Sequence, residues 1–354
     1  MKEAWFYRRE EDSYVRCFLC PHTCRIAVDR RGLCCVRENR DGKLYSLVYG
    51  KIIASHVDPI EKKPLFHFHV GSSSYSIATV GCNLSCRNCQ NWEISQVDSS
   101  ASIWGEDTTP EQVVNNAARY GCLSISYTYT EPTIFYEFAY DCCELAHTKG
   151  IKNIFVTNGY ITTEAVEKIS PFLDAANVDL KSIKEETYRS TFGSKLAPVK
   201  ETIKIMKKEN IWVEVTTLVI PTINDSPDEL TEIARFIKSI GEDIPWHVSA
   251  FYPNYRMIDT PPTNTSTLIK AREIGLREGL RYVYTGNIPG NEGENTYCYN
   301  CGNLLVERYG FTVNKNKVKE NTCPHCNAKI DGIPSMLPSI AAPIVPLYNT
   351  LIEL

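Results

Sequence analysis

The stretch Gly81-Cys82-Asn83-Leu84-Ser85-Cys86-Arg87-Asn88-Cys89-Gln90-Asn91 decides the fold and the chemistry of this chain. It follows a strand-like run, residues 76–80, so three cysteines with C-x3-C-x2-C spacing lie in one loop at a strand end. Iron–sulfur clusters normally take four cysteine thiolates. Three thiolates on a cubane would leave one iron open to another molecule. A zinc site without its fourth protein ligand is an alternative, although structural zinc is usually four-coordinate.

This cysteine spacing resembles that of the radical S-adenosylmethionine (SAM) superfamily. The resemblance implies that Cys82, Cys86 and Cys89 hold a [4Fe–4S] cluster, on a loop after the first strand of a partial (β/α) barrel. In that superfamily the open iron chelates the amino and carboxylate groups of SAM. A buried loop of reduced cysteines without metal is the alternative interpretation.

The composition is that of a globular protein apart from its cysteines. Of 354 residues 43% are hydrophobic and 23% are charged, and the net charge of −4 gives no reason to expect nucleic acid as a partner. The chain has 15 cysteines, most of them in three clusters with metal-ligand spacing, which predicts a reducing, cytoplasmic protein. Residues 332–352 carry no charge, but their prolines argue against a membrane span, so we expect an irregular, Pro-rich apolar tail over 332–354.

Apolar strands alternate with amphipathic helices from residue 76 to about residue 290. Such alternation predicts a parallel sheet, here a partial (β/α)6-type, TIM-like barrel whose site lies at the carboxyl ends of the strands. We expect strands at 76–81, 123–129, 153–158, 176–181, 212–220, 246–251 and 281–285. We expect helices at 110–120, 133–149, 163–170, 197–209, 226–240 and 264–279.

Polar motifs recur where these strands end. Thr130-Glu131-Pro132 follows the second strand, Asn158 the third and Asp179-Leu180-Lys181 the fourth, and His247 is expected near the end of the sixth. Asp179 and Lys181 alternate with Leu180, so both can point into the barrel. The resemblance implies that these residues (Thr130, Glu131, Asn158, Asp179, Lys181 and His247) contact SAM or the substrate.

The segment before the barrel carries its own metal-ligand pattern. Cys17, Cys20, Cys24 and one of Cys34 or Cys35 form a four-ligand set for zinc or a second iron–sulfur cluster. Stretches 43–50 and 52–56 are expected to form hairpin-like strands, with Asp41-Gly42 as a turn signal. His67 and His69 have the i, i+2 spacing of a strand face, and either ligate a metal or pack in a connector.

Two further C-x2-C pairs lie after the barrel. The knuckles Cys298/Cys301 and Cys323/Cys326 predict a zinc ribbon or a rubredoxin-like iron site, with zinc preferred. The predicted domains are a Cys-rich extension over 1–70, the barrel over 71–290, the ribbon over 291–331 and the tail.

Three segments narrow the resemblance further: Cys17 to Cys24, Asp58 to Leu65, and Cys86 to Trp92. They resemble the radical SAM enzyme of the AmmeMemoRadiSam system, which is similar to pyruvate formate-lyase activating enzymes. The resemblance implies Cys34 rather than Cys35 as the fourth N-terminal ligand, because the family has glycine at the position of Cys35. It also implies Memo-like and AMMECR1-like partner proteins, a protein or peptide substrate, and a flavodoxin or ferredoxin as electron donor.

The resulting hypothesis is reductive cleavage of SAM at the cluster to a 5′-deoxyadenosyl radical, which abstracts hydrogen from the substrate. The reaction would either activate a glycyl radical enzyme or modify a side chain. An iron–sulfur electron-transfer or cluster-carrier protein that leaves SAM intact is the alternative function, and a zinc-based interaction module is a third.

Overall fold

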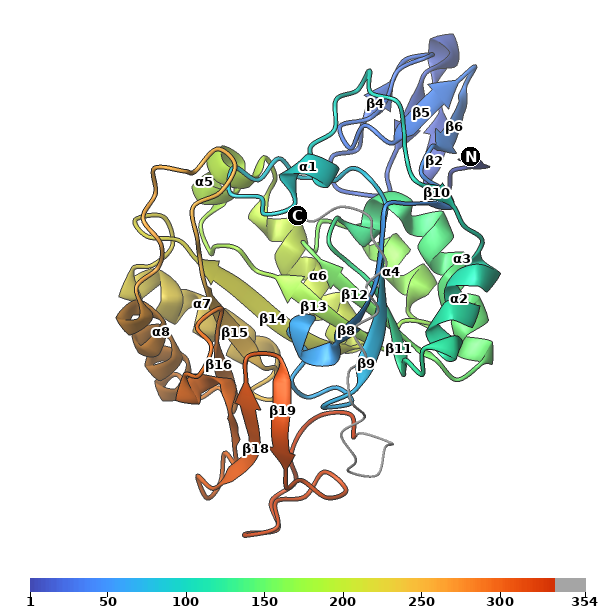
Figure 1. The fold of residues 1–354 in the computed structure, drawn as a ribbon. Helices are drawn as coiled ribbons and strands as arrows, with labels where there is room; N and C mark the ends of the chain where they lie inside the picture. Colours follow the sequence, from blue (N-terminus) through green and yellow to red (C-terminus); the bar gives the residue numbers. More distant parts are fainter. Residues whose placement is uncertain (335–354) are drawn as a thin grey trace.

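A computed structural model describes residues 1–334 and shows an α/β fold around one eight-stranded sheet (Figure 1). The strand order is β16-β15-β14-β13-β12-β11-β9-β8. All neighbouring pairs are parallel except β8 (Ala54–Pro59) with β9 (Ser73–Ala78), which are antiparallel. The remaining strands are β11 (Ser124–Tyr127), β12 (Lys152–Thr157), β13 (Ala175–Asp179), β14 (Trp212–Val219), β15 (Trp246–Ala250) and β16 (Val283–Gly286).

Helices connect consecutive parallel strands, as the sequence pattern predicts. They are α1 (Trp92–Ser95), α2 (Pro110–Arg119), α3 (Tyr136–Thr148), α4 (Thr163–Ile169), α5 (Glu185–Thr187), α6 (Leu196–Lys208), α7 (Pro227–Ile240) and α8 (Thr265–Arg277). Local signals set their ends: a capping box of Thr109 and Gln112 starts α2, and Ser226 caps α7. The predicted partial barrel is therefore confirmed.

The two faces of the sheet pack against different parts of the chain. Phe155 and Val178 belong to the main core that the helices share, whereas Ile154 and Ala175 pack against Ile60, Leu65 and Phe68. Because successive strand residues point to opposite faces, the connector between β8 and β9, which contains Ile60, Leu65 and Phe68, covers the inner face of the sheet. The connector thus closes the sheet from inside, on the face that carries Asn177 and Asp179.

The start of the chain forms a small module of short antiparallel strands. One sheet contains β2 (Tyr7–Arg9), β3 (Val15–Cys17) and β4 (Arg25–Ile26), and the other contains β1 (Lys2–Glu3), β5 (Arg37–Arg40) and β6 (Lys43–Ser46). Asp41-Gly42 makes the predicted turn, but it joins 37–40 to 43–46. The pairing expected between 43–50 and 52–56 is wrong, because 54–59 is β8 of the main sheet. The predicted extension over 1–70 therefore includes a barrel strand.

The module at the other end of the chain contains β17 (Thr296–Tyr297), β18 (Leu304–Tyr309) and β19 (Thr312–Asn316). Figure 1 shows it at the opposite end of the sheet from the N-terminal module. A small two-stranded ladder joins β7 (Lys51–Ile52) to β10 (Glu106–Asp107). No helix within residues 1–334 has the length and apolar character needed to cross a bilayer. Most of the predicted tail, residues 335–354, lies outside the described residues.

Candidate active site

The three-cysteine loop connects β9 to α1. Its first residue, Gly81, has φ +98°, and an added Cβ would lie 3.0 Å from the carbonyl oxygen of Cys34 and 2.7 Å from Val36 Cγ1. Glycine is required here because both the left-handed backbone and the close approach exclude a side chain. The loop therefore starts in direct contact with the N-terminal module.

Backbone hydrogen bonds with two segments that follow other strands hold this loop. Ser85 and Arg87 donate to the carbonyls of Phe192 and Thr191 (3.1 and 3.0 Å), in the segment that follows β13. Arg256, beyond β15, donates to the carbonyl of Arg87 at 3.0 Å. The loop is consequently held by backbone contacts with the segments that follow β13 and β15.

The thiols of the loop lie in a setting that suits metal ligation. Burial raises the pKa of Cys82, and the nearby Glu131 adds to this effect. Burial raises the pKa of Cys86 to about 11, while the Lys181 ammonium opposes the rise. Buried thiolates need a cation for stability, and a coordinated metal deprotonates thiols outright. These residues fit the three-cysteine cluster that the spacing predicts.

Glu131 joins the ends of β11 and β12. Its carboxylate accepts from Thr133 N (3.1 Å), Thr133 Oγ1 (2.6 Å), Thr157 Oγ1 (2.7 Å) and Asn158 N (2.8 Å), and burial raises its pKa. Asn158 Nδ2 in turn lies 2.8 Å from Asn83 Oδ1 and 3.7 Å from Cys82 Sγ. Glu131 and Asn158 thus connect the strand ends directly to the cysteine loop.

Thr130 has an internal partner as well. Its hydroxyl donates to the carbonyl of Thr79 at 2.8 Å, between β9 and the cysteine loop. The preceding residue, Tyr129, has φ +61°, and its carbonyl accepts from Asn91 Nδ2 at 2.7 Å. This turn therefore presents its backbone to the cysteine loop.

Asp179 and Lys181 form an ion pair at the end of β13. Lys181 Nζ lies 2.7 Å from Asp179 Oδ2, and the two side chains are 18% and 36% exposed. The pKa of Lys181 is raised because Asp179 and the Cys86 thiol outweigh the opposing effect of burial. Both charges therefore act on Cys86, which places the pair beside the loop.

His247 lies elsewhere. The expectation that it sits at a strand end is wrong, because it is the second residue of β15, near the amino ends of the strands. Its Nε2 lies 2.7 Å from Glu214 Oε2, and its ring packs against Phe66 and Tyr284.

The predicted histidine pair does not converge either. His67 Nδ1 contacts the carbonyl of Asp331 and its Nε2 contacts Tyr284 Oη (2.7 and 2.6 Å), while the ring of His69 packs against Phe68. Both histidines are buried in the connector. These contacts match the alternative interpretation, in which His67 and His69 pack in a connector and do not ligate a metal together.

The four N-terminal cysteines are brought near one another. Burial raises the pKa of Cys34 to about 12, and Cys17 and Cys24 add to this rise. Burial also raises the pKa of Cys20, with further contributions from Cys17, Cys34 and Cys24. Cys35 differs: it is half-buried, and the charges that act on it belong to Asp98 and Arg31. The grouping thus contains Cys34 and leaves Cys35 aside.

The C-terminal cysteines form a compact set. The sulfur atoms of Cys298, Cys301, Cys323 and Cys326 all lie within 4.8 Å of one another, as the ligands of a single tetrahedral ion would. Asn303 Nδ2 donates to Cys301 Sγ at 3.3 Å and helps lower the pKa of that thiol to about 6. This four-cysteine site is present as the paired knuckles predict, and its metal remains a prediction.

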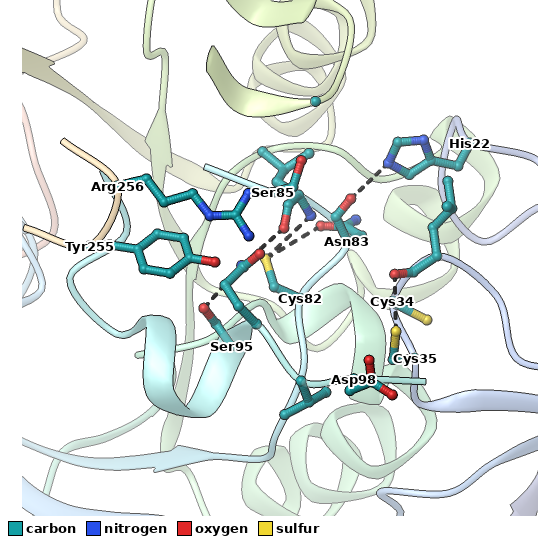
Figure 2. A pocket seen from close by; sticks show the side chains of 15 residues that line it. His22, Cys34, Cys35, Cys82, Asn83, Ser85, Ser95, Asp98, Tyr255 and Arg256 are labelled. Atoms are coloured by element: carbon teal, nitrogen blue, oxygen red, sulfur yellow. Dashed lines mark hydrogen bonds between the residues drawn. The ribbon is translucent and has the colours of Figure 1, made fainter. Parts of the chain in front are cut away.

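A pocket of about 340 Å³ lies where the cysteine loop meets the N-terminal module (Figure 2). Cys82, Cys34, Cys35 and Asp98 line it together with the aromatic and cationic side chains of Tyr255 and Arg256. Sequence reasoning missed several residues that contact the loop or line this pocket, namely Asn83, Ser95, Asp98, Tyr255 and Arg256. Of these residues only Asn83 lies within a recognised motif, the C-x3-C-x2-C loop.

Comparisons with known proteins agree with this geometry. The profile of the radical SAM superfamily matches residues 76–237. The chain belongs to the radical SAM superfamily. It is 47% identical to the uncharacterized protein MJ0808 of Methanocaldococcus jannaschii, over 94% of this chain and 99% of that protein. It is also 23% identical to the pyruvate formate-lyase-activating enzyme of Listeria monocytogenes, over 57% of this chain and 80% of that enzyme.

Among solved structures, Streptococcus suis SuiB bound to S-adenosylmethionine has a TM-score of 0.48 at 16% identity, over 59% of this chain and 49% of SuiB. The chain is a radical SAM enzyme homologous to pyruvate formate-lyase activating enzymes, and its family implies a [4Fe–4S] cluster and SAM. Membership of the AmmeMemoRadiSam subgroup stays a prediction.

Proposed function

We propose that this enzyme reductively cleaves SAM and uses the resulting radical to abstract hydrogen from a protein or peptide. The observation that carries the proposal is the meeting of the Cys82 loop with Glu131, Asn158 and the Asp179–Lys181 pair at one edge of the sheet. When bound to Cys82, Cys86 and Cys89, a [4Fe–4S] cluster supplies the electron that breaks the S–C5′ bond of SAM.

The protein's part is positioning and charge. Glu131 fixes Asn158 beside Cys82, and the half-buried Asp179–Lys181 pair offers both a carboxylate and an ammonium toward SAM. We propose Thr130, Glu131, Asn158, Asp179 and Lys181 as the residues that bind or position SAM. His247 is removed from this set because its contacts lie with Glu214 and the connector.

The macromolecular substrate is inferred from the relatives. Pyruvate formate-lyase-activating enzyme and the isethionate sulfite-lyase activating enzyme of Desulfovibrio desulfuricans, which is 28% identical over 42% of this chain, are both named for an enzyme that they activate. A flavodoxin or ferredoxin is the expected electron donor, and Memo-like and AMMECR1-like proteins are the expected partners, in a reducing cytoplasm.

The outer cysteine sets are proposed as further metal sites. The compact set at Cys298, Cys301, Cys323 and Cys326 suits zinc, as a structural or docking ribbon at the end opposite the SAM site. Arg308 anchors it by donating to the carbonyl of Phe66 at 3.0 Å and to Thr296 Oγ1 at 2.8 Å.

The decisive comparison uses Cys86→Ala and, as a control, Cys122→Ala, whose thiol is buried in the main core. Anaerobically reconstituted protein is given SAM and dithionite, and 5′-deoxyadenosine is measured. We expect the product from the control and at least a hundredfold less from Cys86→Ala. Intact SAM beside a reducible cluster in the wild type would favour the electron-carrier alternative.

The substrate class needs a second readout. Peptides deuterated at the α-carbon of glycine or at side-chain carbons would be supplied, and deuterium in 5′-deoxyadenosine would be measured by mass spectrometry. Label from glycine indicates glycyl radical activation, and label from a side chain indicates modification. If 5′-deoxyadenosine takes up deuterium from neither peptide but does so from a small metabolite, a protein or peptide substrate is contradicted.

A further inference from the structure

The N-terminal cysteine set lies against the radical SAM loop. The carbonyl oxygen of Cys34 approaches Gly81, the residue before Cys82, closely enough to exclude a Cβ. His22, which lies between Cys20 and Cys24, contacts the carbonyl of Asn83 through Nε2 at 2.7 Å. Figure 2 shows His22 and Cys34 on one side of the pocket that Cys82 and Asn83 also line.

The backbone holds the four N-terminal thiols in one place. Cys17 N donates to the carbonyl of Cys24 at 2.9 Å, which closes the C-x2-C-x3-C loop onto β3. A Cβ added to Gly32 would lie 3.6 Å from Cys24 Sγ, so the segment leading to Cys34 passes directly over that sulfur. The chain therefore folds back to bring the fourth cysteine to the first three.

The spacing of these sulfur atoms distinguishes two kinds of site. Within residues 1–334, the C-terminal cysteines are the group whose ligand atoms all lie within 4.8 Å of one another, and neither the Cys82 set nor the N-terminal set meets that condition. A cubane holds each thiolate on a different iron, so its sulfur ligands lie farther apart than those of one zinc ion. Cys17, Cys20, Cys24 and Cys34 are thus less compact than the four ribbon cysteines.

A buried cation accompanies the set. Arg37 is 2% exposed, its charge acts on both Cys17 and Cys34, and its guanidinium pairs with Glu137 at 2.5 Å. Four thiolates on a cluster carry net negative charge, which a buried guanidinium stabilises. Arg37 thus provides a buried guanidinium near Cys17 and Cys34, while the Glu137 carboxylate opposes its effect on Cys17.

We propose that Cys17, Cys20, Cys24 and Cys34 hold a second [4Fe–4S] cluster, adjacent to the radical SAM cluster and able to exchange an electron with it. This deepens the proposed function, on which its redox role rests. A low-potential one-electron donor of the ferredoxin or flavodoxin class would reduce the N-terminal centre by one electron. The same electron would then pass to the neighbouring centre, with no proton transferred. All four cysteine ligands are protein-derived, so this centre has no open iron for SAM.

The test separates the two centres by variant and by metal content. In Cys82→Ala/Cys86→Ala/Cys89→Ala we expect about four irons per chain and one zinc after anaerobic reconstitution, against about eight irons in the wild type. Its reduced spectrum in electron paramagnetic resonance should not change on addition of SAM. Cys34→Ala should lose about four irons, whereas Cys35→Ala should keep them all.

Proximity gives a second readout. In the doubly reduced wild type the two centres should broaden each other's resonance, and the broadening should vanish in the triple variant and in Cys34→Ala. Two zincs and about four irons in the wild type would overturn the proposal while leaving SAM cleavage intact. A triple variant that binds about four irons would support the second cluster. If the wild type then leaves SAM intact, that result would contradict the proposed function without affecting the second cluster.

If Cys34→Ala fails to fold, the more conservative Cys20→Ser at another partly buried position replaces it, with retained ribbon zinc as the folding control. Loss of iron to the triple-variant level in Cys20→Ser supports the proposal, and full iron content contradicts it.

Discussion

Glu131→Gln should disconnect the strand ends from the cysteine loop. One carboxylate oxygen accepts three hydrogen bonds, from Thr133 N, Thr133 Oγ1 and Thr157 Oγ1, while the other accepts only from Asn158 N. The glutamine amide will keep its oxygen on the three donors and turn its NH2 toward Asn158. Two donors then face each other in a buried site.

The magnitude follows from that geometry. The variant loses one charge-assisted hydrogen bond and leaves a buried N–H without an acceptor, which costs about 2–4 kcal/mol in the free energy of unfolding. Asn158 must move, and with it the amide that contacts Asn83 and Cys82. We expect the Kd for SAM to rise at least tenfold, which corresponds to about 1.4 kcal/mol.

The assay compares anaerobically reconstituted wild type and Glu131→Gln by thermal unfolding and by equilibrium binding of SAM. Glu144→Gln on the exposed face of α3 serves as the control and should stay within about 0.5 kcal/mol of the wild type. A Glu131→Gln protein with unchanged stability and unchanged affinity for SAM would refute the positioning role.

Three further predictions concern charge and metal. Burial raises the pKa of Asp58, but Lys63 and Tyr129 lower it below the usual range, so the stabilisation by its carboxylate is present above about pH 4 and is lost as pH falls further. Asp58→Asn should therefore lower the free energy of unfolding by about 3 kcal/mol near neutral pH and by less in acid, as measured by denaturation across pH. An equal loss at all pH values would contradict this prediction. Lys181→Met removes the cation beside Cys86 and should weaken SAM binding about tenfold with iron content unchanged, by calorimetry and metal analysis. Cys301→Ser should release the ribbon metal and lower the thermal midpoint while 5′-deoxyadenosine formation persists, and retained zinc by elemental analysis would argue against the ribbon site.

Much of the fold could be predicted because its signals are local. Each expected strand and helix from residue 76 onward was found within a few residues, since apolar runs, helix caps and the alternation of elements are written in neighbouring positions. The meeting of Glu131, Asn158 and the Cys82 loop also followed, because parallel strands place their carboxyl ends at one edge. These predictions needed no knowledge of long-range contacts.

The failures all depend on long-range packing. Nothing local indicates that residues 54–59 would pair antiparallel with β9, or that His247 would face the connector through Glu214. The contact between Gly81 and Cys34 joins segments that are distant in sequence, so the proximity of the two cysteine sets emerged only from the structure. Loop residues such as Tyr255 and Arg256 reach the pocket for the same reason.

The most direct measurement is the yield of 5′-deoxyadenosine per chain from anaerobically reconstituted wild-type protein given SAM and dithionite. We expect product from the wild type and none above background from the variant that replaces Cys82, Cys86 and Cys89 by alanine. Equal yields from the two proteins, or intact SAM beside a fully reduced cluster in the wild type, would contradict the central claim.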